Sequence, residues 1–223
     1  MKNNHRIHII TGHYGSGKTE FAINYALKRA EVRGDIVIGD LDIVNPYFRS
    51  REKQEELAEA GIRIVSSSTG YSSADVPALS PEIYGILQKE EYEVILDVGG
   101  DPVGARVLGR YKEYFEPGHY DMWMVVNANR PNTQDAQSVL EYIEGIESTS
   151  RVAITGLINN THMLRETTQE DLIRGNKLLE EVSNHTNLPI VYTSAIKEVA
   201  DHLPEGISGE ILPLELRMRP DWL

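Results

Sequence analysis

The sequence contains no cysteine, few aromatic residues and few basic ones. Without thiols it can form no disulfide, thiolate metal site or cysteine nucleophile. Only 22 lysines and arginines stand against 34 acidic residues, so a formal net charge of -12 argues against binding to a nucleic-acid backbone. No segment approaches the ~20 apolar residues of a membrane span, and the N-terminal apolar run is too short for a signal peptide. We therefore expect a cytoplasmic protein that binds neither nucleic acid nor a membrane.

Short runs rich in Ile and Val alternate with stretches of helical length. The strand-like runs lie at 7–10, 35–40, 62–65, 92–98, 121–127, 152–159 and 189–193, and the helix-like stretches at 20–33, 50–60, 133–146 and 168–185. This alternation predicts a three-layer α/β fold, with a mostly parallel central sheet of about seven strands and helices on both faces. No domain boundary is evident, so we expect residues 1–223 to form one domain. Segment 66–82, rich in Ser, Gly and Pro, is expected to be a long loop.

The segment TGHYGSGKTEF at 11–21 contains the pattern G-x-x-x-x-G-K-[ST]. An apolar strand precedes the pattern and a helical stretch follows it, as in a phosphate-binding P-loop. Backbone N–H groups of such a loop form an anion-binding nest at a helix N-terminus. Lys18 is placed to reach the β- and γ-phosphates, and Thr19 to coordinate Mg²⁺. The predicted nucleotide-binding residues of this segment are Gly12, His13, Tyr14, Gly15, Ser16, Gly17, Lys18, Thr19 and Glu20.

Carboxylates stand at the ends of two later strands. Asp40 and Asp42 follow the second apolar run, and Asp97 closes the fourth, shortly before Gly100. A strand-end carboxylate beside a P-loop can hold the water shell of Mg²⁺, and a nearby glycine can offer its N–H to the γ-phosphate. Asp97 is the stronger candidate, because a carboxylate that ends a buried strand is costly without a partner. Asp40 and Asp42 could instead simply end their strand.

Together, the P-loop, the D-x-D, the Asp-x-x-Gly and a late strand-end Asn resemble the MinD/ParA/CobQ-type ATPases of the SIMIBI class, related to CooC and Mrp-like proteins. The resemblance implies an ATPase that uses ATP and Mg²⁺. It implies that Thr19, Asp40 and Asp97 serve the metal, that Lys18 and Asp42 are catalytic, and that Gly100 lies in a switch loop. It also implies that Asn159 contacts the adenine ring, although Asn159 or Asn160 could equally cap a turn.

The front of the P-loop departs from this family. His13 stands where many members carry a lysine that reaches the partner's nucleotide across a dimer, and a neutral imidazole cannot supply that fixed charge. In this respect the loop is similar to the UreG/HypB-type GTPase metallochaperones. Guanine recognition usually needs N/T-K-x-D, which the late strand end NNTHM lacks, and NTQD at 132–135 is better explained as a helix start capped by Asn132 or Thr133. ATP is therefore favoured over GTP.

The leading hypothesis is an ATPase that switches between ATP- and ADP-bound states and acts on a protein partner, with weak activity when the partner is absent. A nucleotide-dependent homodimer is one form of this hypothesis. One alternative is an ATP-dependent small-molecule ligase or kinase similar to CobB and dethiobiotin synthetase, with 66–82 as a substrate lid. Others are a UreG/HypB-like GTPase and a regulator that scarcely hydrolyses. The tail LPLELRMRPDWL contains two prolines, which argue against a MinD-like membrane helix.

Overall fold

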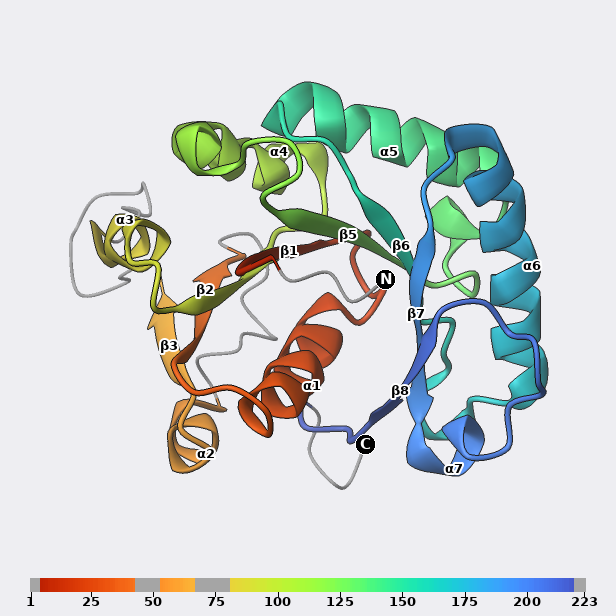
Figure 1. The fold of residues 1–223 in the computed structure, drawn as a ribbon. Coiled ribbons are helices and arrows are strands. Elements are labelled where there is room, and N and C mark those ends of the chain that lie inside the picture. Colours follow the sequence, from red (N-terminus) through yellow and green to blue (C-terminus); the bar gives the residue numbers. More distant parts are fainter. Residues whose placement is uncertain (1–4, 43–52, 67–80, 219–223) are drawn as a thin grey trace, which may run out of the picture.

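The computed structural model describes residues 5–42, 53–66 and 81–218, and its centre is a parallel β-sheet (Figure 1). The eight strands are β1 (Ile7–Thr11), β2 (Ile36–Leu41), β3 (Arg63–Ser66), β4 (Glu93–Val98), β5 (Asp121–Val126), β6 (Gly156–Asn159), β7 (Ile190–Ile196) and β8 (Glu210–Leu214). Their order is β3-β2-β4-β1-β5-β6-β7-β8, and all neighbours are parallel. The strand that leads into the P-loop therefore lies inside the sheet, between β4 and β5.

Helices cover both faces of the sheet and bury two apolar cores. The helices are α1 (Lys18–Ala30), α2 (Gln54–Glu59), α3 (Pro81–Gln88), α4 (Pro102–Ala105), α5 (Ala136–Ser150), α6 (Gln169–Thr186) and α7 (Lys197–Ala200), with 3-10 segments η2 (Arg106–Tyr114), η3 (Pro131–Thr133) and η4 (Leu164–Glu166). One core joins the sheet to α1 and α2, and the other joins it to α3, η2, α5 and α6, as Figure 1 shows. The predicted three-layer α/β fold is confirmed.

Strand β6 begins at Gly156 rather than at 152, and two further differences from the sequence prediction have a clear physical reason. The C-terminal region forms an eighth strand, β8, in which Pro213 is tolerated because β8 is an edge strand and pairs only with β7. Helix α5 begins at Ala136 rather than at 132–133, because Asp135 caps it by accepting a 2.8 Å hydrogen bond from the Ser138 N–H. Most of the predicted loop at 66–82 lies outside the described residues, as do residues 43–52.

The register of the central strands explains how distant carboxylates meet. Asp40 on β2 is the direct neighbour of Asp97 on β4, and Asp97 is also the neighbour of Ile10 on β1. Because side chains alternate along a strand, both aspartates point to the face that α1 covers, with Ile38 and Ile95. Parallel strands end at one edge of the sheet, so the residues that follow β1, β2 and β4 gather there.

A buried ionic cluster lies at the opposite ends of the central strands, where three of them begin. His8 lies between two fully buried carboxylates, with its Nε2 3.2 Å from Glu93 Oε1 and its Nδ1 3.3 Å from Asp121 Oδ2. Arg29 of α1 donates two hydrogen bonds to Glu93, at 2.6 and 3.0 Å. Burial opposes ionisation of Glu93, but the hydrogen bonds from His8 and Arg29 outweigh it and lower the pKa of Glu93 to about 2.

The same contacts shift the other members of this cluster. Burial alone would lower the pKa of His8, but Asp121 and Glu93 outweigh burial and raise it. Burial would raise the pKa of Asp121, and its contacts with His8 and His5 lower it instead. The folded protein thus buries paired charges where these strands begin, at the end of the sheet that lies away from the P-loop.

Within the described parts of the chain, no helix has both the length and the apolar character needed to cross a bilayer.

Candidate nucleotide-binding site

The P-loop joins β1 to α1 through a turn that only glycines can make. Gly12, Gly15 and Gly17 have φ values of 143°, 76° and 85°. A side chain at Gly12 would also overlap the carbonyl of Val125 on β5. Gly17 is the N-cap of α1, so the positive end of the helix dipole opens directly onto the loop, with Lys18 as its first residue.

Three side chains outside the loop hold its carbonyl groups. Asn160 Nδ2 donates to Ser16 O at 2.7 Å, while Arg130 Nε and Asn127 Nδ2 donate to Gly15 O at 3.0 and 3.5 Å. Carbonyls that are bonded to these donors leave the loop's N–H groups to face an anion. Sequence reasoning missed Asn127 and Arg130. The only signal was their place directly after a buried strand that neighbours the P-loop strand.

The metal end of the site joins the P-loop to β4. Thr19 Oγ1 donates a 2.7 Å hydrogen bond to Asp97 Oδ2, and Asp97 is fully buried. Its second oxygen, Oδ1, has no hydrogen-bond partner among the described residues. Burial, together with the nearby charges of Asp40 and Asp42, raises the pKa of Asp97 to about 7, although Lys18 acts in the opposite direction.

This arrangement fits a hydrated Mg²⁺ ion. Among residues 5–42, 53–66 and 81–218, no group of three or more His, Asp or Glu side chains could enclose a metal by itself. Mg²⁺ does not need such a cage, because it keeps several waters and commonly uses one or two carboxylates plus substrate phosphates. The hydroxyl of Thr19, the unbonded oxygen of Asp97 and the neighbouring Asp40 supply the donor types that such an ion requires.

The remaining predicted phosphate residues lie at the same edge. Lys18 is buried, and its Nζ is 3.7 Å from Asp42 Oδ2. Gly100 lies directly against the loop, since a Cβ added there would overlap the Gly12 carbonyl and lie 3.0 Å from Lys18 Nζ. The structure therefore brings together Lys18, Thr19, Asp40, Asp42, Asp97 and Gly100, which come from three separate parts of the sequence. The loop that follows Asp42 lies outside the described residues.

A cavity of about 260 Å³ adjoins the P-loop and has one apolar wall. Residues of the P-loop, including Tyr14 and Glu20, line one side, while Asn160 and His162 line another part. The apolar wall comes from the end of β7 and from β8 and the residues after it: Ala195, Ile196, Leu214, Leu216 and Met218. An apolar wall beside a phosphate loop suits the flat face of a nucleotide base.

Residues 215–218, which we call the C-terminal strap, are fastened to α1. Glu20 accepts hydrogen bonds from the N–H groups of Arg217 and Met218, at 2.7 and 3.1 Å. Asn24 exchanges two hydrogen bonds with the backbone of Glu215, at 3.0 and 2.9 Å. Burial raises the pKa of Glu20, while the two N–H groups partly offset that effect. The predicted nucleotide-binding residue Glu20 thus builds the cavity wall.

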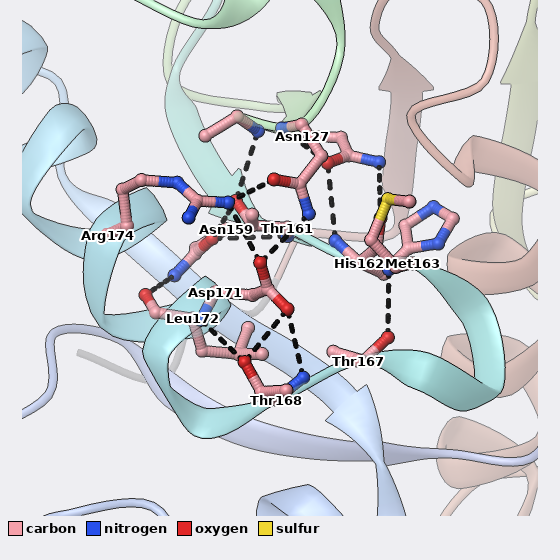
Figure 2. A network of polar contacts seen from close by, with 12 residues as sticks. Asn127, Asn159, Thr161, His162, Met163, Thr167, Thr168, Asp171, Leu172 and Arg174 are labelled. Atoms are coloured by element: carbon pink, nitrogen blue, oxygen red, sulfur yellow. Dashed lines mark hydrogen bonds and ion pairs between the residues drawn. The ribbon is translucent and has the colours of Figure 1, made fainter.

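Asn159 is occupied by contacts within the protein. Its Nδ2 donates to Leu172 O at 2.9 Å, and its Oδ1 accepts from the N–H and hydroxyl of Thr161. Figure 2 shows this amide in a network that ties the ends of β5 and β6 to the start of α6. Asn159 is fully buried and does not line the cavity, whereas Asn160 does. These contacts do not support the adenine role predicted for Asn159.

His13 is engaged within its own chain. Its Nδ1 lies 2.7 Å from Tyr14 O, and its Nε2 lies 2.7 Å from Nδ2 of Asn132. Its ring also packs against Tyr142 of α5, with ring centroids 5.4 Å apart. His13, which stands where many family members carry the lysine that reaches across a dimer, therefore makes these contacts within its own chain.

Solved structures of FtsY share this fold. FtsY from Mycoplasma mycoides is 17% identical, with a TM-score of 0.55 over 86% of this chain and 60% of that one. Chloroplast FtsY from Physcomitrella patens is 16% identical, with a TM-score of 0.54 over 93% and 61%. FtsY from Thermotoga maritima, titled a cell division protein, is 16% identical, with a TM-score of 0.54 over 87% and 63%.

This chain therefore spans about three fifths of the length of those proteins. No protein-family profile and no curated protein gives a match to the sequence. Identities below one fifth establish the architecture alone. The chain has the three-layer P-loop NTPase fold that is also found in FtsY.

Proposed function

We propose that residues 1–223 act as one Mg²⁺-dependent nucleotide-binding domain of the SIMIBI class, which hydrolyses a nucleoside triphosphate and works as a switch on a partner. The observation that carries this proposal is the hydrogen bond between Thr19 and the buried Asp97, whose second oxygen has no hydrogen-bond partner in the described part of the chain. A P-loop threonine and a strand-end carboxylate in contact are what a hydrated Mg²⁺ bound to nucleotide phosphates requires.

The proposed roles follow from position. When bound, Mg²⁺ neutralises charge on the phosphates. Lys18 would leave its contact with Asp42 and bind the terminal phosphates, and Asp42 would then be available to orient the attacking water. Gly100, which lies against Gly12 and Lys18, would offer its N–H to the γ-phosphate. Such catalysis consists of positioning and charge stabilisation rather than covalent chemistry.

We propose ATP rather than GTP as the nucleotide. Guanine recognition through N-K-x-D needs a carboxylate three residues after the asparagine, and the residue at that distance from Asn160 is Met163. Among the described residues that line the cavity, the only acidic one is Glu20, whose oxygens already accept two backbone N–H groups. The D-x-D at 40–42 supports the MinD/ParA/CobQ branch, because it is one of the motifs on which the resemblance to that family rests.

We also propose that a protein partner covers the edge that carries the P-loop. Three exposed apolar side chains follow the carboxyl ends of strands there, namely Tyr14, Val103 and Met163, with exposed fractions of 61%, 64% and 50%. Contiguous exposed apolar patches mark docking surfaces, and these three side chains are the candidates for such a patch at this edge. A second copy of this chain is one such partner. No contact of the described residues favours the ligase alternative, since 67–80 lies outside them.

Binding measurements with matched lysine variants test the proposal. Lys18→Ala is expected to weaken Mg²⁺–ATP binding by at least about tenfold, because it removes the charge nearest the phosphates. Lys28→Ala is the control, since Lys28 is on the same helix but pairs with Glu210 at the surface. Titration calorimetry with ATP, GTP and ADP, each with and without Mg²⁺, would report affinity and base preference. Equal affinities for the two variants would contradict the proposed site, and tighter binding of GTP would contradict the choice of ATP.

A further inference from the structure

Tyr142 lies outside every sequence motif, yet it contacts both loops that border the proposed phosphate site. It is a half-buried residue in the middle of α5, and its hydroxyl donates a hydrogen bond to Gly100 O. Its ring packs edge-on against His13 of the P-loop, at 5.4 Å between centroids and 65° between planes. Burial and the charge of Asp101 raise the pKa of Tyr142, so the hydroxyl keeps its proton and remains a donor.

The Gly100 peptide, which Tyr142 binds, is well placed to contact a terminal phosphate. Gly100 is packed so tightly against Gly12 and Lys18 that an added Cβ would not fit. Because the peptide unit is planar, a bond to the Gly100 carbonyl also fixes the direction of the next N–H, that of Asp101. Helix α4 starts directly after this peptide with Asp101 as its N-cap, so the orientation of the peptide is carried into α4.

His13 supports Tyr142 from the P-loop side. A neutral imidazole with its proton on Nδ1 satisfies both of its polar contacts, since Nδ1–H donates to Tyr14 O and Nε2 accepts from the Asn132 amide. The amide holds the ring against Tyr142, and α5 also packs on the start of α4, where a Cβ on Gly145 would lie 3.5 Å from Pro102. P-loop, α5 and the segment after β4 are thus joined within one chain.

We propose that Tyr142 is a positioning residue for hydrolysis, which holds Gly100 where it meets the γ-phosphate, with His13 as its support. The inference rests on the proposed nucleotide-hydrolysing function. Residues of a single chain then couple the front of the P-loop, at His13, to the segment that follows Asp97. A ligand with a γ-phosphate would be distinguished from a diphosphate partly through the Tyr142 hydroxyl.

The test is Tyr142→Phe, which removes the hydroxyl and keeps the ring against His13. The expected result is a fall in kcat for Mg²⁺–ATP of about tenfold, as for the loss of one hydrogen bond that acts more strongly in the transition state than in the ground state, with ADP affinity within about twofold of wild type. The affinity ratio of the non-hydrolysable analogue AMP-PNP to ADP should fall as well. His13→Ala should lower kcat less, and the double variant should be no slower than Tyr142→Phe.

Tyr114→Phe is the matched control, because the Tyr114 hydroxyl accepts a hydrogen bond from Gln88 in another part of the structure. A Tyr142→Phe variant with the kcat and the AMP-PNP to ADP ratio of this control would overturn the inference. Equal losses of ADP and AMP-PNP affinity, together with a lower melting temperature, would also overturn it, because they indicate a purely structural role. A wild-type protein that binds no nucleotide would instead contradict the proposed function. If wild type binds but turns over too slowly to measure, the affinity ratio decides.

Discussion

Asp40 and Asp97 are direct neighbours on adjacent parallel strands, and both are buried. Two carboxylates side by side repel each other, and neither would be retained in an apolar core for the sake of stability alone. Under the proposed function, this repulsion is a cost that the fold bears for binding Mg²⁺ and the nucleotide phosphates. Replacing one of the two aspartates should therefore raise the stability of the protein and lower its activity.

Asp97→Asn should abolish turnover and stabilise the protein without ligand. The carboxylate is disfavoured by burial and by the charges of Asp40 and Asp42, as its raised pKa of about 7 shows, so a neutral amide of the same shape relieves repulsion. We expect a gain of about 1 kcal/mol or more in the free energy of unfolding at pH 8. Mg²⁺-dependent hydrolysis should fall by at least about 100-fold. Urea unfolding and a phosphate-release assay check the two parts, and a less stable variant would contradict the electrostatic argument.

Glu93→Gln should destabilise the protein and flatten its acid denaturation. The folded-state pKa of Glu93 is about 2 against an ordinary value of 4.5, so its contribution is fully present above about pH 4.5 and is lost as the pH falls toward 2. At pH 7 the variant leaves His8 and Arg29 facing a neutral group, and we expect a loss of about 3 kcal/mol. Urea titrations between pH 3 and 7 measure this. A variant that parallels wild type across that range would refute the assignment.

The His8 side chain should give the opposite pH dependence. Its folded-state pKa is raised above 6.5, so its contribution is present below about pH 6.5 and is lost as the pH rises through the folded-state value. We expect His8→Gln to lower the melting temperature at pH 6 more than at pH 9. His119→Gln is the control, since His119 is 74% exposed. The idea fails if the difference between His8→Gln and wild type is the same at both pH values.

Glu20→Gln should weaken nucleotide binding through the base rather than the phosphates. The amide can accept only one of the two N–H groups of Arg217 and Met218 and presents its own NH₂ to the other, so the end of the C-terminal strap should loosen from α1 while Asn24 still holds Glu215. We expect a loss of about five- to tenfold in ADP affinity, with little change for pyrophosphate. Competition against a fluorescent nucleotide measures both. Glu31→Gln, at the exposed end of α1, is the control, and an equal loss for ADP and pyrophosphate would count against the strap.

The parts of this site that sequence could predict are the local ones. The P-loop depends on three closely spaced glycines between a strand and a helix, and Asp97 ends an unmistakable apolar strand. The contacts of Asn159 do not support its predicted adenine role, and the reason is its position at the strand end. Neighbouring residues at a strand end point to opposite faces, so an uncertainty of one residue exchanges the side that meets the P-loop.

Other features lay beyond the sequence because they depend on packing between remote segments. The two prolines of the tail LPLELRMRPDWL argue only against a long helix, and the alternation of Leu212, Leu214, Leu216 and Met218 with other residues is the one local signal for a strand there. The ion pairs of His8 have no signal in the sequence, since nothing in it shows that the starts of β1, β4 and β5 adjoin. Tyr142 has no pattern of its own, and only the contact of α5 with the segment after β4 gives it a role.

Because every strand runs in the same direction, the sheet has two chemically different rims, and they can change independently. The rim with the paired aspartates carries the proposed nucleotide site, whereas the rim with His8, Glu93 and Asp121 carries buried ion pairs whose contribution to stability depends on pH. Substitutions at the second rim could shift the pH range in which the fold is stable and leave the residues around the P-loop unchanged. A protein engineer could use that rim to offset the instability of new specificities built at the first.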